Sequence, residues 1–345
     1  MKILWRKIYG SYCWGREWLP FTIWLLQQCL LRRKKAVLVC RFGAMGDVVC
    51  ALPLCDALRE RHPDQLIVFV TSSLYRNLVD LSGAADLVYG SKLWVWPFVM
   101  PSQFNVFDLV AAVYNPQNSD EVSDRSASML HLVDEFAASC GVALIKRQPH
   151  LYPSDHLIRT TRRKYGLGEQ ELGTKKLIAI NGGPTWPVRM WETSKWQTLI
   201  DHIHAEHDAV ILQFGQRQPG KSSDLENLTG VVSLFDHLKP EEIVALIAVS
   251  DLVVAIDSGP VHLAGAVGTP VVGLFGAINP LFRMPPDSPS IGLLSDVECL
   301  YCNHRSPIIH WKEGCPYDIK CMKQLEVQSV IEAVDSVMQG RGAHN

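Results

Sequence analysis

Two series of short apolar runs, each followed by a helical stretch, constrain the fold of this chain more than any other feature. The run AVLVCRF at 36–42 opens the first series, and LIAIN at 177–181 opens the second. Continuous apolar runs of this length that alternate with helices are typical of parallel strands buried on both faces. The sequence therefore predicts an α/β protein with two doubly wound parallel sheets.

The length of 345 residues suits two domains of ordinary size. A charged, glycine-containing passage at 154–176 lies between the two series and predicts the connection between them. We expect four parts, namely an amphipathic, basic N-terminal extension, a first Rossmann-like domain, a second Rossmann-like domain, and a C-terminal helix with a tail. Their predicted bounds are 1–35, 36–172, 173–325 and 326–345.

The N-terminal extension contains the apolar stretch WLPFTIWLLQQCLL at 18–31, which RRKK follows directly. Its fourteen residues fall short of the ~20 that a membrane-spanning helix needs, and no small-residue cleavage site follows. Two interpretations stay open. The helix lies in the interface of an anionic cytoplasmic membrane face, or it packs on the protein's own surface or a second subunit. The loop at 91–104 is likewise either a lipid- or acceptor-facing segment or core packing.

The formal net charge of −2 argues against a nucleic-acid-binding protein, because phosphate-backbone binding usually needs a marked basic surplus. Six of the ten cysteines lie singly in apolar surroundings, where buried thiols are common. The other four cluster near the C-terminus and are treated below. Composition therefore favours a globular protein without nucleic acid as a partner.

The segment DSGPVHLAGAVG at 257–268 follows the apolar run DLVVAI and predicts an anion site. Ligands of open parallel sheets bind beyond the carboxyl ends of strands, where the next helix presents its N–H groups and positive dipole end. Gly259 permits close approach of a ligand, Ser258 can cap the helix, and His262 can donate to a phosphate oxygen. Alternatively, Asp257 and Ser258 only cap the helix, and His262 only satisfies a core carbonyl.

The turn RFGAMGD at 41–47 follows the first predicted strand. Its two glycines, Gly43 and Gly46, resemble a phosphate-binding turn, although the dinucleotide fingerprint G-x-G-x-x-G is absent. Asp47 is the informative residue, because it lies at a helix N-terminus, where the dipole favours a carboxylate, and would face a cleft between domains. It is either a helix cap or a general base.

The segment NGGPTWPVRMW at 181–191 follows the first strand of the second series. Gly182 and Gly183 permit close approach, Thr185 offers a hydroxyl, and Arg189 offers a bidentate fork for phosphate. The segment is predicted at the same sheet edge as Ser258, so that both would face one anion. The alternative is an aromatic surface loop.

These three segments together resemble glycosyltransferase family nine, the bacterial heptosyltransferases that build the inner core of lipopolysaccharide. The resemblance runs from residue 35 to about residue 338, with the segments in the family's order. AVLVCRFGAMGD resembles the family's opening strand and S-x-G-D turn. DSGPVHLAGAVGTP is similar to its D-T-G-x-x-H-L-A-x-A-x-G-x-P segment, and GGPTWPVRMW resembles its donor loop.

The resemblance implies a GT-B architecture, in which two Rossmann-like domains face each other across a cleft, and inverting sugar transfer without a catalytic cofactor or metal. By the same resemblance, Asp47 is the base, with Arg41, Gly43 and Gly46 in the acceptor-side turn. The donor-binding residues it implies are Thr185, Arg189, Asp257, Ser258, Gly259 and His262. The implied partners are a nucleotide sugar, for which we expect ADP-heptose, a lipopolysaccharide-core or lipid-linked acceptor, and the inner-membrane surface. The implied location is the cytoplasm, peripheral on the inner membrane; no oligomeric state is predicted.

This chain departs from the family pattern at three places. Arg189 stands where the family usually has Lys, and Ser258 replaces the commoner Thr. The loop after AVILQFG reads QRQPGKSSD, where the family often has an acidic residue that reaches the donor ribose. The resemblance therefore assigns no residue to the ribose.

Four cysteines form the pattern C-x₂-C-x₁₂-C-x₅-C between residues 299 and 321. Cys299 and Cys302 have metal-ligand spacing, and Cys315 and Cys321 complete a four-thiolate set loosely. Three interpretations stay open, namely a structural zinc or iron, two disulfides, or four free thiols. The resemblance favours the metal, because similar cysteine sets in the autotransporter heptosyltransferase branch hold iron.

Two other functions stay open on the sequence alone. One is transfer of heptose onto a protein, as in the autotransporter branch; the absence of an extra N-terminal domain counts against it. The other is a non-catalytic nucleotide-sugar-binding protein. Asp47 separates this second alternative from an enzyme, since a pure binder needs no carboxylate opposite the diphosphate.

Overall fold

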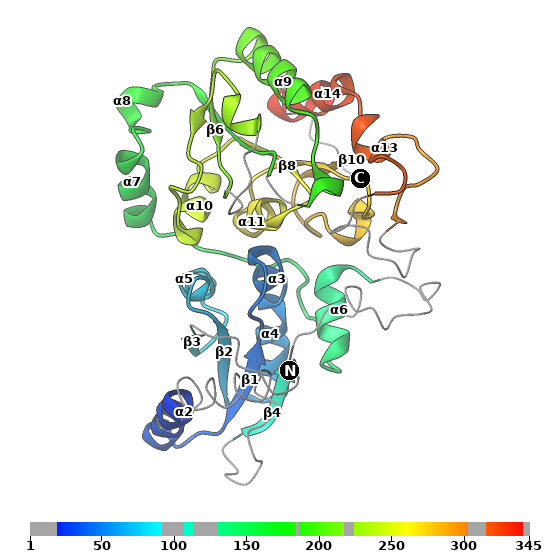
Figure 1. Ribbon diagram of the computed structural model, residues 1–345. Coiled ribbons are helices and arrows are strands. Elements are labelled where there is room, and N and C mark those ends of the chain that lie inside the picture. The colour runs from blue at the N-terminus through cyan, green and yellow to red at the C-terminus, as the bar shows by residue number, and fades with distance from the viewer. Residues whose placement is uncertain are drawn as a thin grey trace, which may run out of the picture. The chain divides into compact units, whose positions relative to one another are not determined.

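The computed structural model describes residues 19–91, 107–112, 130–183, 186–216, 224–302 and 315–340. These residues divide into two compact units (Figure 1). Unit 1 holds the described residues up to 112 and residues 133–149, and unit 2 holds residues 130–132 and 150–340. Each unit contains its own parallel sheet, as the alternating pattern predicts.

Unit 1 is built around a four-stranded parallel sheet with the order β3-β2-β1-β4. Its strands read as apolar runs because β1 and most of β2 are buried on both faces. The elements assigned to unit 1, in chain order, are α2 (Leu19–Arg32), β1 (Ala36–Cys40), α3 (Met45–Cys50), α4 (Leu52–Arg61), β2 (Leu66–Ser72), α5 (Arg76–Asp80), β3 (Leu87–Ser91), β4 (Phe107–Ala112) and α6 (Leu132–Ser139), whose first residue belongs to unit 2.

The helical stretch after β1 is divided in two at Ala51. Pro53 lies in the first turn of α4, where its missing N–H and fixed φ are tolerated. The division makes α3 a short helix that begins directly after the turn, and it places Asp47 in the first turn of α3.

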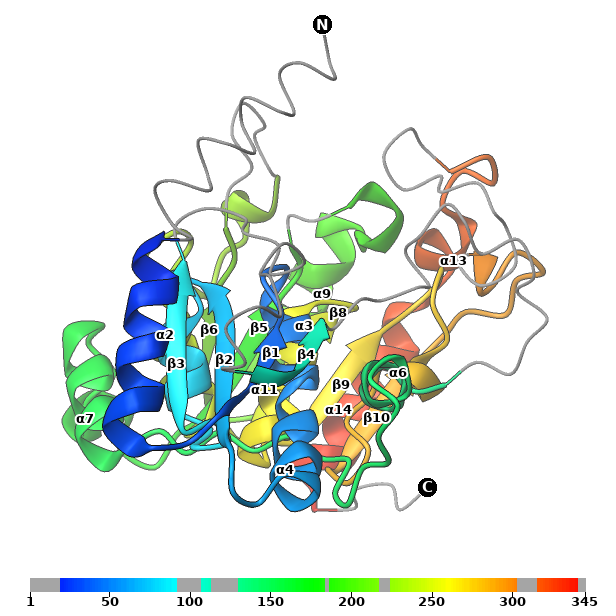
Figure 2. The ribbon, with the colours of Figure 1, turned by 90° about the horizontal axis from the view of Figure 1, so that it is seen from below.

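Helix α2 packs on the sheet of its own unit. Phe21, Leu25 and Cys29 are buried against β1 and β2, and the ring of Phe21 lies 4.8 Å from that of Tyr89 in β3. Figure 2 shows α2 alongside this sheet. The outer face keeps Leu30 and Leu31 at 76% and 79% exposure, next to the basic run.

Of the two interpretations of the N-terminal stretch, the described residues therefore support packing on the protein's own surface. Membrane contact, and with it a peripheral location at the inner membrane, stays a prediction. Within the described part of the chain, no helix combines the length and the apolarity that crossing a bilayer requires. The segment at 92–104 lies outside the described residues.

Unit 2 contains a six-stranded parallel sheet with the order β10-β9-β8-β5-β6-β7. Its strands are β5 (Lys176–Asn181), β6 (Ala209–Gln213), β7 (Val232–Ser233), β8 (Leu252–Ile256), β9 (Val271–Leu274) and β10 (Ser290–Leu293). Its helices are α7 (Asp155–Lys164), α8 (Glu169–Leu172), α9 (Thr193–Glu206), α10 (Pro240–Ile247), α11 (Gly259–Val267), α13 (Lys320–Lys323) and α14 (Val327–Met338), with short 3-10 turns η5 (Pro187–Arg189), η6 (Asp224–Asn227) and η7 (Pro280–Phe282).

The strand order of unit 2 reverses direction at the pair β5 and β8. From β5 the chain continues to β6 and β7 on one side, and it later returns to β8, β9 and β10 on the other. In open parallel sheets, ligands bind beyond the carboxyl ends of the strands at such a switch point. The fold of unit 2 therefore directs attention to the residues that follow β5 and β8.

Helices cover both faces of the unit 2 sheet. Helices α9 and α14 pack together on one face, and their core includes the fully buried Trp196. Helices α10 and α11 pack on the other. The small residues Ala264, Gly265 and Ala266 are buried in α11, which lets this helix lie close to β8 and β9.

The segment at 150–172 packs with unit 2, although the predicted domain boundary lies at 172. The main-chain N–H of Leu151 donates to the carbonyl of Ala266 at 2.8 Å. The Lys164 ammonium pairs with the Glu242 carboxylate at 2.7 Å and so ties α7 to α10. Burial tends to raise the pKa of Glu242, but bonds from Lys164 and the Lys239 N–H outweigh it and hold the pKa below its ordinary value.

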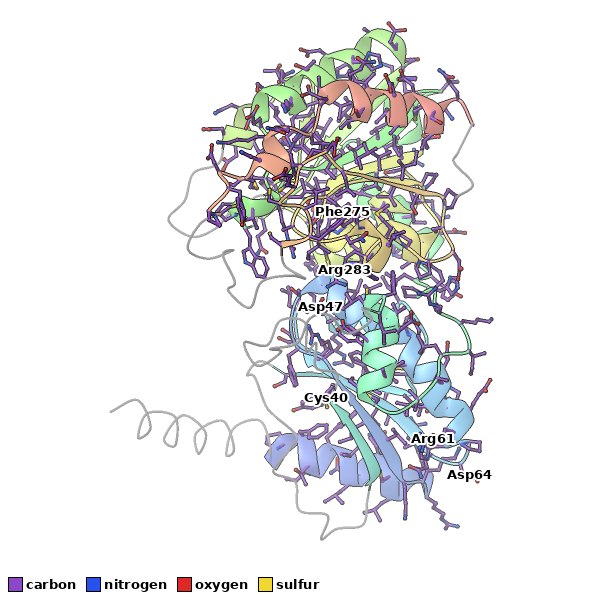
Figure 3. All side chains as sticks on the ribbon, turned by 90° about the vertical axis from the view of Figure 1, so that its right-hand side faces the viewer. Cys40, Asp47, Arg61, Asp64, Phe275 and Arg283 are labelled. Atoms are coloured by element: carbon purple, nitrogen blue, oxygen red, sulfur yellow. The ribbon has the colours of Figure 1, made fainter. Side chains whose placement is uncertain are left out.

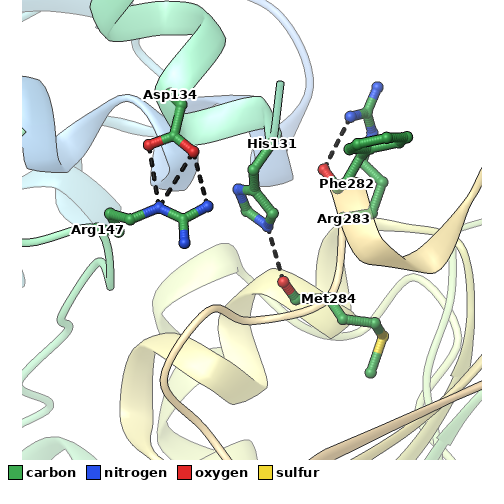
Figure 4. Close-up of polar contacts among 6 residues, drawn as sticks. All are labelled: His131, Asp134, Arg147, Phe282, Arg283 and Met284. Atoms are coloured by element: carbon green, nitrogen blue, oxygen red, sulfur yellow. Dashed lines mark hydrogen bonds and ion pairs between the residues drawn. The ribbon is translucent and has the colours of Figure 1, made fainter. Parts of the chain in front are cut away.

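Near residue 132 the chain passes from unit 2 to unit 1. Within unit 2, the His131 Nε2 lies 2.8 Å from the carbonyl oxygen of Met284, which accepts its hydrogen bond. Within unit 1, the Arg147 guanidinium forks onto the Asp134 carboxylate with contacts of 2.6–3.1 Å. Figure 4 shows both contacts. These two contacts hold the chain in place before and after residue 132, one within each unit.

One strand of the unit 2 sheet is shorter than the apolar pattern of its segment suggests. The run VVSLF at 231–235 forms a strand only at Val232–Ser233, and both residues are exposed. It lies at the edge of the sheet, where only one neighbour is available to pair. Leu234 and Phe235, which follow the strand, are buried. Their apolar side chains therefore serve the core and do not indicate further strand residues.

Candidate active site

The edge of the unit 2 sheet where β5 and β8 end carries a connected set of polar side chains. The Ser258 hydroxyl, after β8, donates to Asn181 Oδ1 at the end of β5 at 3.1 Å and also lies 2.8 Å from the Ile256 carbonyl. The Asn181 amide donates in turn to the Phe214 carbonyl, beyond β6, at 2.6 Å. These bonds join three neighbouring strands at the predicted ligand-binding edge.

Ser258 occupies the N-cap position of α11, but its side chain makes no capping hydrogen bond. The predicted capping role is wrong, because the hydroxyl is used on Asn181 and Ile256 instead. The helix begins with Gly259 and with Pro260 in its first turn, and His262 lies buried in the same turn. The N-terminus of α11 thus keeps the dipole and amide geometry that suit an anion.

Arg189 lies at this edge through a contact with Asp257. Its Nη1 donates to the main-chain oxygen of Asp257 at 3.0 Å, and its Nε lies 3.2 Å from the Asp257 carboxylate as an ion pair. The guanidinium also lies over the ring of Trp186, 4.7 Å from the ring centre. The two side chains are 19% and 9% exposed, so the charges are largely withdrawn from water and fix each other's orientation.

The glycines of this region have different roles. A Cβ on Gly182 would lie 2.9 Å from the Trp196 indole nitrogen, so core packing alone requires glycine here, and close approach of a ligand at Gly182 stays a prediction. Gly183 has a φ of +111° that favours glycine, and its carbonyl would lie 2.4 Å from a Cβ on Gly215. The two loops after β5 and β6 therefore touch through their backbones. Thr185 lies outside the described residues.

In unit 1, the turn after β1 holds Asp47. Its carboxylate pairs with the Arg41 guanidinium, whose other face covers the Phe136 ring at 5.1 Å. Burial raises the pKa of the Tyr75 hydroxyl, and the negative charge of Asp47 raises it further, so Tyr75 is a near neighbour. The Asp47 side chain is 21% exposed. Figure 3 shows Asp47 at one end of unit 1, with Arg61 and Asp64 at the other.

The glycines of that turn lie around Asp47. Gly46 is buried within the first turn of α3, and Gly43 precedes the N-cap residue Ala44. Asp47 itself stands two residues inside α3, and the N-cap has no side-chain hydrogen bond. The structure therefore brings Arg41, Gly46 and Asp47 together at the carboxyl edge of the unit 1 sheet.

The described cysteines form no disulfide. Cys321 is buried in α13, and its pKa is raised to about 12 by burial and by the nearby thiols of Cys299, Cys302 and Cys315. Cys315 also packs on a small cluster with Val188, Ile278 and Trp186. Cys315 thus adjoins the turn that carries Arg189. Two histidines between these cysteines, His304 and His310, are further candidate ligands by sequence and lie outside the described residues.

Two features of the site were not predicted from the sequence. The role of Asn181 is missed because the sequence there indicates only the start of a loop. Its position directly after an apolar run, at the end of a predicted strand, is the signal that could have indicated a polar side chain at the sheet edge. The pairing of Arg189 with Asp257, 68 positions apart in the chain, has no local signal. Both depend on which strand ends lie next to each other in the sheet.

A model of the family described as glycosyltransferase family 9 (heptosyltransferase) matches residues 112–311. The lipopolysaccharide core heptosyltransferase OpsX of Haemophilus influenzae is 49% identical over 293 residues, covering 73% of this chain and 82% of that protein. The lipopolysaccharide heptosyltransferase 1 of Pseudomonas aeruginosa is 28% identical over 48% of this chain. Lipopolysaccharide heptosyltransferase 3 of Escherichia coli is 32% identical over 28% of this chain. The chain spans only 49% and 30% of the length of these last two relatives.

Solved structures share the fold. The glycosyltransferase of family 9 from Veillonella parvula has a TM-score of 0.66 at 17% identity, covering 89% of this chain and 97% of that one. The ADP-heptose heptosyltransferase II of E. coli has a TM-score of 0.64 at 16% identity, over 89% and 99%. The iron-containing glycosyltransferase TibC of enterotoxigenic E. coli H10407 has a TM-score of 0.60 at 14% identity, over 89% and 77%. The predicted GT-B class, with two Rossmann-like domains, is confirmed.

Proposed function

Because the chain belongs to glycosyltransferase family 9, we propose that it is an enzyme that transfers a heptose from ADP-heptose to a lipopolysaccharide-core or other lipid-linked acceptor. The observation that supports this most is the polar edge at β5 and β8 of unit 2, where Ser258, Asn181 and Arg189 adjoin the N-terminus of α11. The proposed acceptor is supported by OpsX, which is named a lipopolysaccharide core heptosyltransferase. The proposed donor is supported by the E. coli heptosyltransferase II, which is named an ADP-heptose enzyme.

The donor diphosphate would lie at the N-terminus of α11. There it would receive the helix dipole, close approach at Gly259 and a hydrogen bond from His262. Arg189 would add its positive charge, and the ion pair with Asp257 would hold the guanidinium in the orientation needed for a phosphate. Contact of Thr185 with the same phosphates stays a prediction.

The proposed reaction is a single displacement that inverts the anomeric carbon. The acceptor hydroxyl oxygen bonds to that carbon, and the bond from the carbon to the diphosphate oxygen breaks. ADP leaves with the electron pair of the broken bond, and the hydroxyl proton passes to the Asp47 carboxylate. Charge develops on the diphosphate in the transition state, so that donors already aimed at it lower the barrier. The groups that neutralise it belong to the chain, and no metal is assigned to this step.

An assay with a panel of nucleotide sugars tests the proposal. Purified protein would be given ADP-heptose, ADP-glucose, UDP-glucose or GDP-mannose, with either a deacylated core acceptor that lacks its heptose or an unmodified polypeptide. We expect nucleotide release only with ADP-heptose and only when the acceptor is present. Donor binding without transfer to any acceptor would indicate a binding protein, transfer only to a polypeptide would indicate a protein heptosyltransferase, and absence of binding by every donor would contradict the proposal.

We also propose that the four cysteines hold a structural iron or zinc. Cys299, Cys302 and Cys315 raise the pKa of the Cys321 thiol, which indicates that the four side chains share one neighbourhood. Among the described residues, however, no three of their sulfur atoms lie within 4.8 Å of one another, so that a bound metal would draw them closer. A metal ion would stabilise the thiolate forms of these cysteines, and sulfur ligands suit both metals. Because Cys315 packs against Trp186 and Val188, a metal would stiffen the turn that carries Arg189. TibC is named as an iron-containing glycosyltransferase, which favours iron over zinc.

Metal analysis of protein purified without oxygen tests this assignment. We expect about one iron or zinc per chain in the wild type and none at this site in a Cys299→Ser, Cys302→Ser double variant. The double variant should also melt at a lower temperature, because metal binding adds to folding stability. A Cys140→Ser variant is the matched control, since Cys140 is only partly buried and belongs to unit 1, whereas the four cysteines belong to unit 2. A metal-free wild type with the same melting temperature as the double variant would rule out the site.

A further inference from the structure

A second group of metal-ligating side chains lies in unit 2, on the helix pair α9 and α14. His202 lies in the last turns of α9, His207 follows its end, and Asp335 lies on α14. The Nε2 atoms of both imidazoles approach the same carboxylate oxygen of Asp335, at 3.1 Å for His202 and 2.8 Å for His207. One ligand atom from each residue lies within 4.8 Å of the other two.

The backbone explains how the two histidines come together. His207 is the C-cap residue of α9 and has extended φ and ψ, while its N–H still bonds to the Ile203 carbonyl. The chain therefore leaves the helix at this point, and the His207 ring turns back toward His202. The two ring centres lie 6.3 Å apart, with the planes at 75°. Both rings present Nε2 to a common point.

The spacing fits a small divalent cation. Ligands at about 2.0–2.1 Å from a tetrahedral zinc lie roughly 3.3 Å from one another. The nitrogen-to-oxygen separations of 3.1 and 2.8 Å are shorter than this value, so that small side-chain shifts would admit the ion in place of the two hydrogen bonds. The side chains of His202, His207 and Asp335 are 23%, 15% and 28% exposed. They are therefore partly shielded from solvent and partly accessible to it.

The chemistry of the group also suits a cation. Two imidazole nitrogens and one carboxylate oxygen form a donor set typical of zinc.

The group lies at the edge of the sheet opposite to the polar edge described above. Strand β6 begins at Ala209, directly after His207 and Asp208, whereas Asn181 and Ser258 lie where β5 and β8 end. Helices α9 and α14 pack against each other (Figure 1). A metal here would join the end of one helix to the other without reaching a bound donor.

We propose that His202, His207 and Asp335 bind one Zn²⁺, with water as the fourth ligand, and that this ion clamps α9 to α14. The clamp is structural and is separate from both the donor site and the cysteine cluster. It does not depend on the proposed function.

Zinc titration of chelator-treated protein tests the proposal. The Cys299→Ser, Cys302→Ser double variant serves as the background, so that the cysteines do not compete for the metal. With zinc chloride as the only ligand, we expect one equivalent to bind and the melting temperature to rise with zinc concentration. His202→Gln, His207→Gln and Asp335→Asn should each weaken binding by more than about tenfold, since losing even an outer-shell partner has that effect.

His204→Gln is the matched control, because His204 lies on the same helix but bonds to the Gly230 carbonyl at 2.6 Å. It should keep the full affinity, and nucleotide release by the Asp335→Asn variant should stay within about twofold of the wild type. Asp335→Asn preserves shape, so it remains informative where a histidine variant unfolds. Zinc binding that is absent, or unchanged in Asp335→Asn, would overturn the proposal.

Discussion

Replacement of Asp47 by Asn is expected to lower turnover by about two to four orders of magnitude. The proposed base would lose its ability to take the acceptor proton, while the donor pocket, which is built from unit 2, would be unaffected. The affinity for ADP should therefore change little, whereas the melting temperature should fall because the Arg41 guanidinium loses the carboxylate that pairs with it. Single-turnover rates with ADP-heptose and acceptor, together with a calorimetric titration of ADP, measure both quantities.

The control for this variant is Asp56→Asn. Asp56 is exposed on α4 in the same unit, so that its replacement removes a carboxylate of equal charge away from the turn. It should leave turnover unchanged. If Asp47→Asn turns over at the rate of Asp56→Asn, Asp47 has no part in the proton transfer.

Replacement of Arg189 by Gln is expected to weaken ADP binding by about 30-fold or more, since truncating one member of a buried charge pair costs about 2 kcal/mol or more. Two effects add together. The phosphate loses a cationic partner, and the buried Asp257 carboxylate is left without the guanidinium that now pairs with it. The melting temperature should fall as well.

A double variant separates these two effects. Arg189→Gln with Asp257→Asn removes the unpaired charge, so the melting temperature should recover while the ADP affinity stays low. Arg189→Lys should lie between the wild type and Arg189→Gln, because it keeps the charge but not the planar fork. Recovery of full ADP affinity in the double variant would show that Arg189 only neutralises Asp257 and does not contact phosphate.

The sequence predicts the sheet edges well because parallel strands are continuous apolar runs. The run DLVVAI ends at the predicted strand end, Ile256, and the run LIAIN ends with β5 at Asn181. The apolar pattern alone therefore indicates the residues after these ends as site candidates. The turn after β1, with Asp47 in the first turn of α3, is predicted in the same way.

The contacts between these residues could not be predicted, because they depend on neighbours that are distant in the chain. Ser258 has the sequence signature of a helix cap, yet Asn181 takes its hydroxyl once β5 and β8 are adjacent. Gly182 resembles a ligand-binding glycine, but Trp196 fills the space beside it. For both residues the local sequence allows more than one role, and the contacts made in the folded chain determine which role is used.

The configuration of the transferred sugar tests the central claim most directly. If a base on the acceptor side and a diphosphate-holding pocket act in one displacement, the heptose in the product must have the anomeric configuration opposite to that in the donor. Proton and carbon NMR of the product formed from ADP-heptose measure this configuration. We expect inversion, and retention of the donor configuration would contradict the proposed roles of Asp47 and of the pocket at α11.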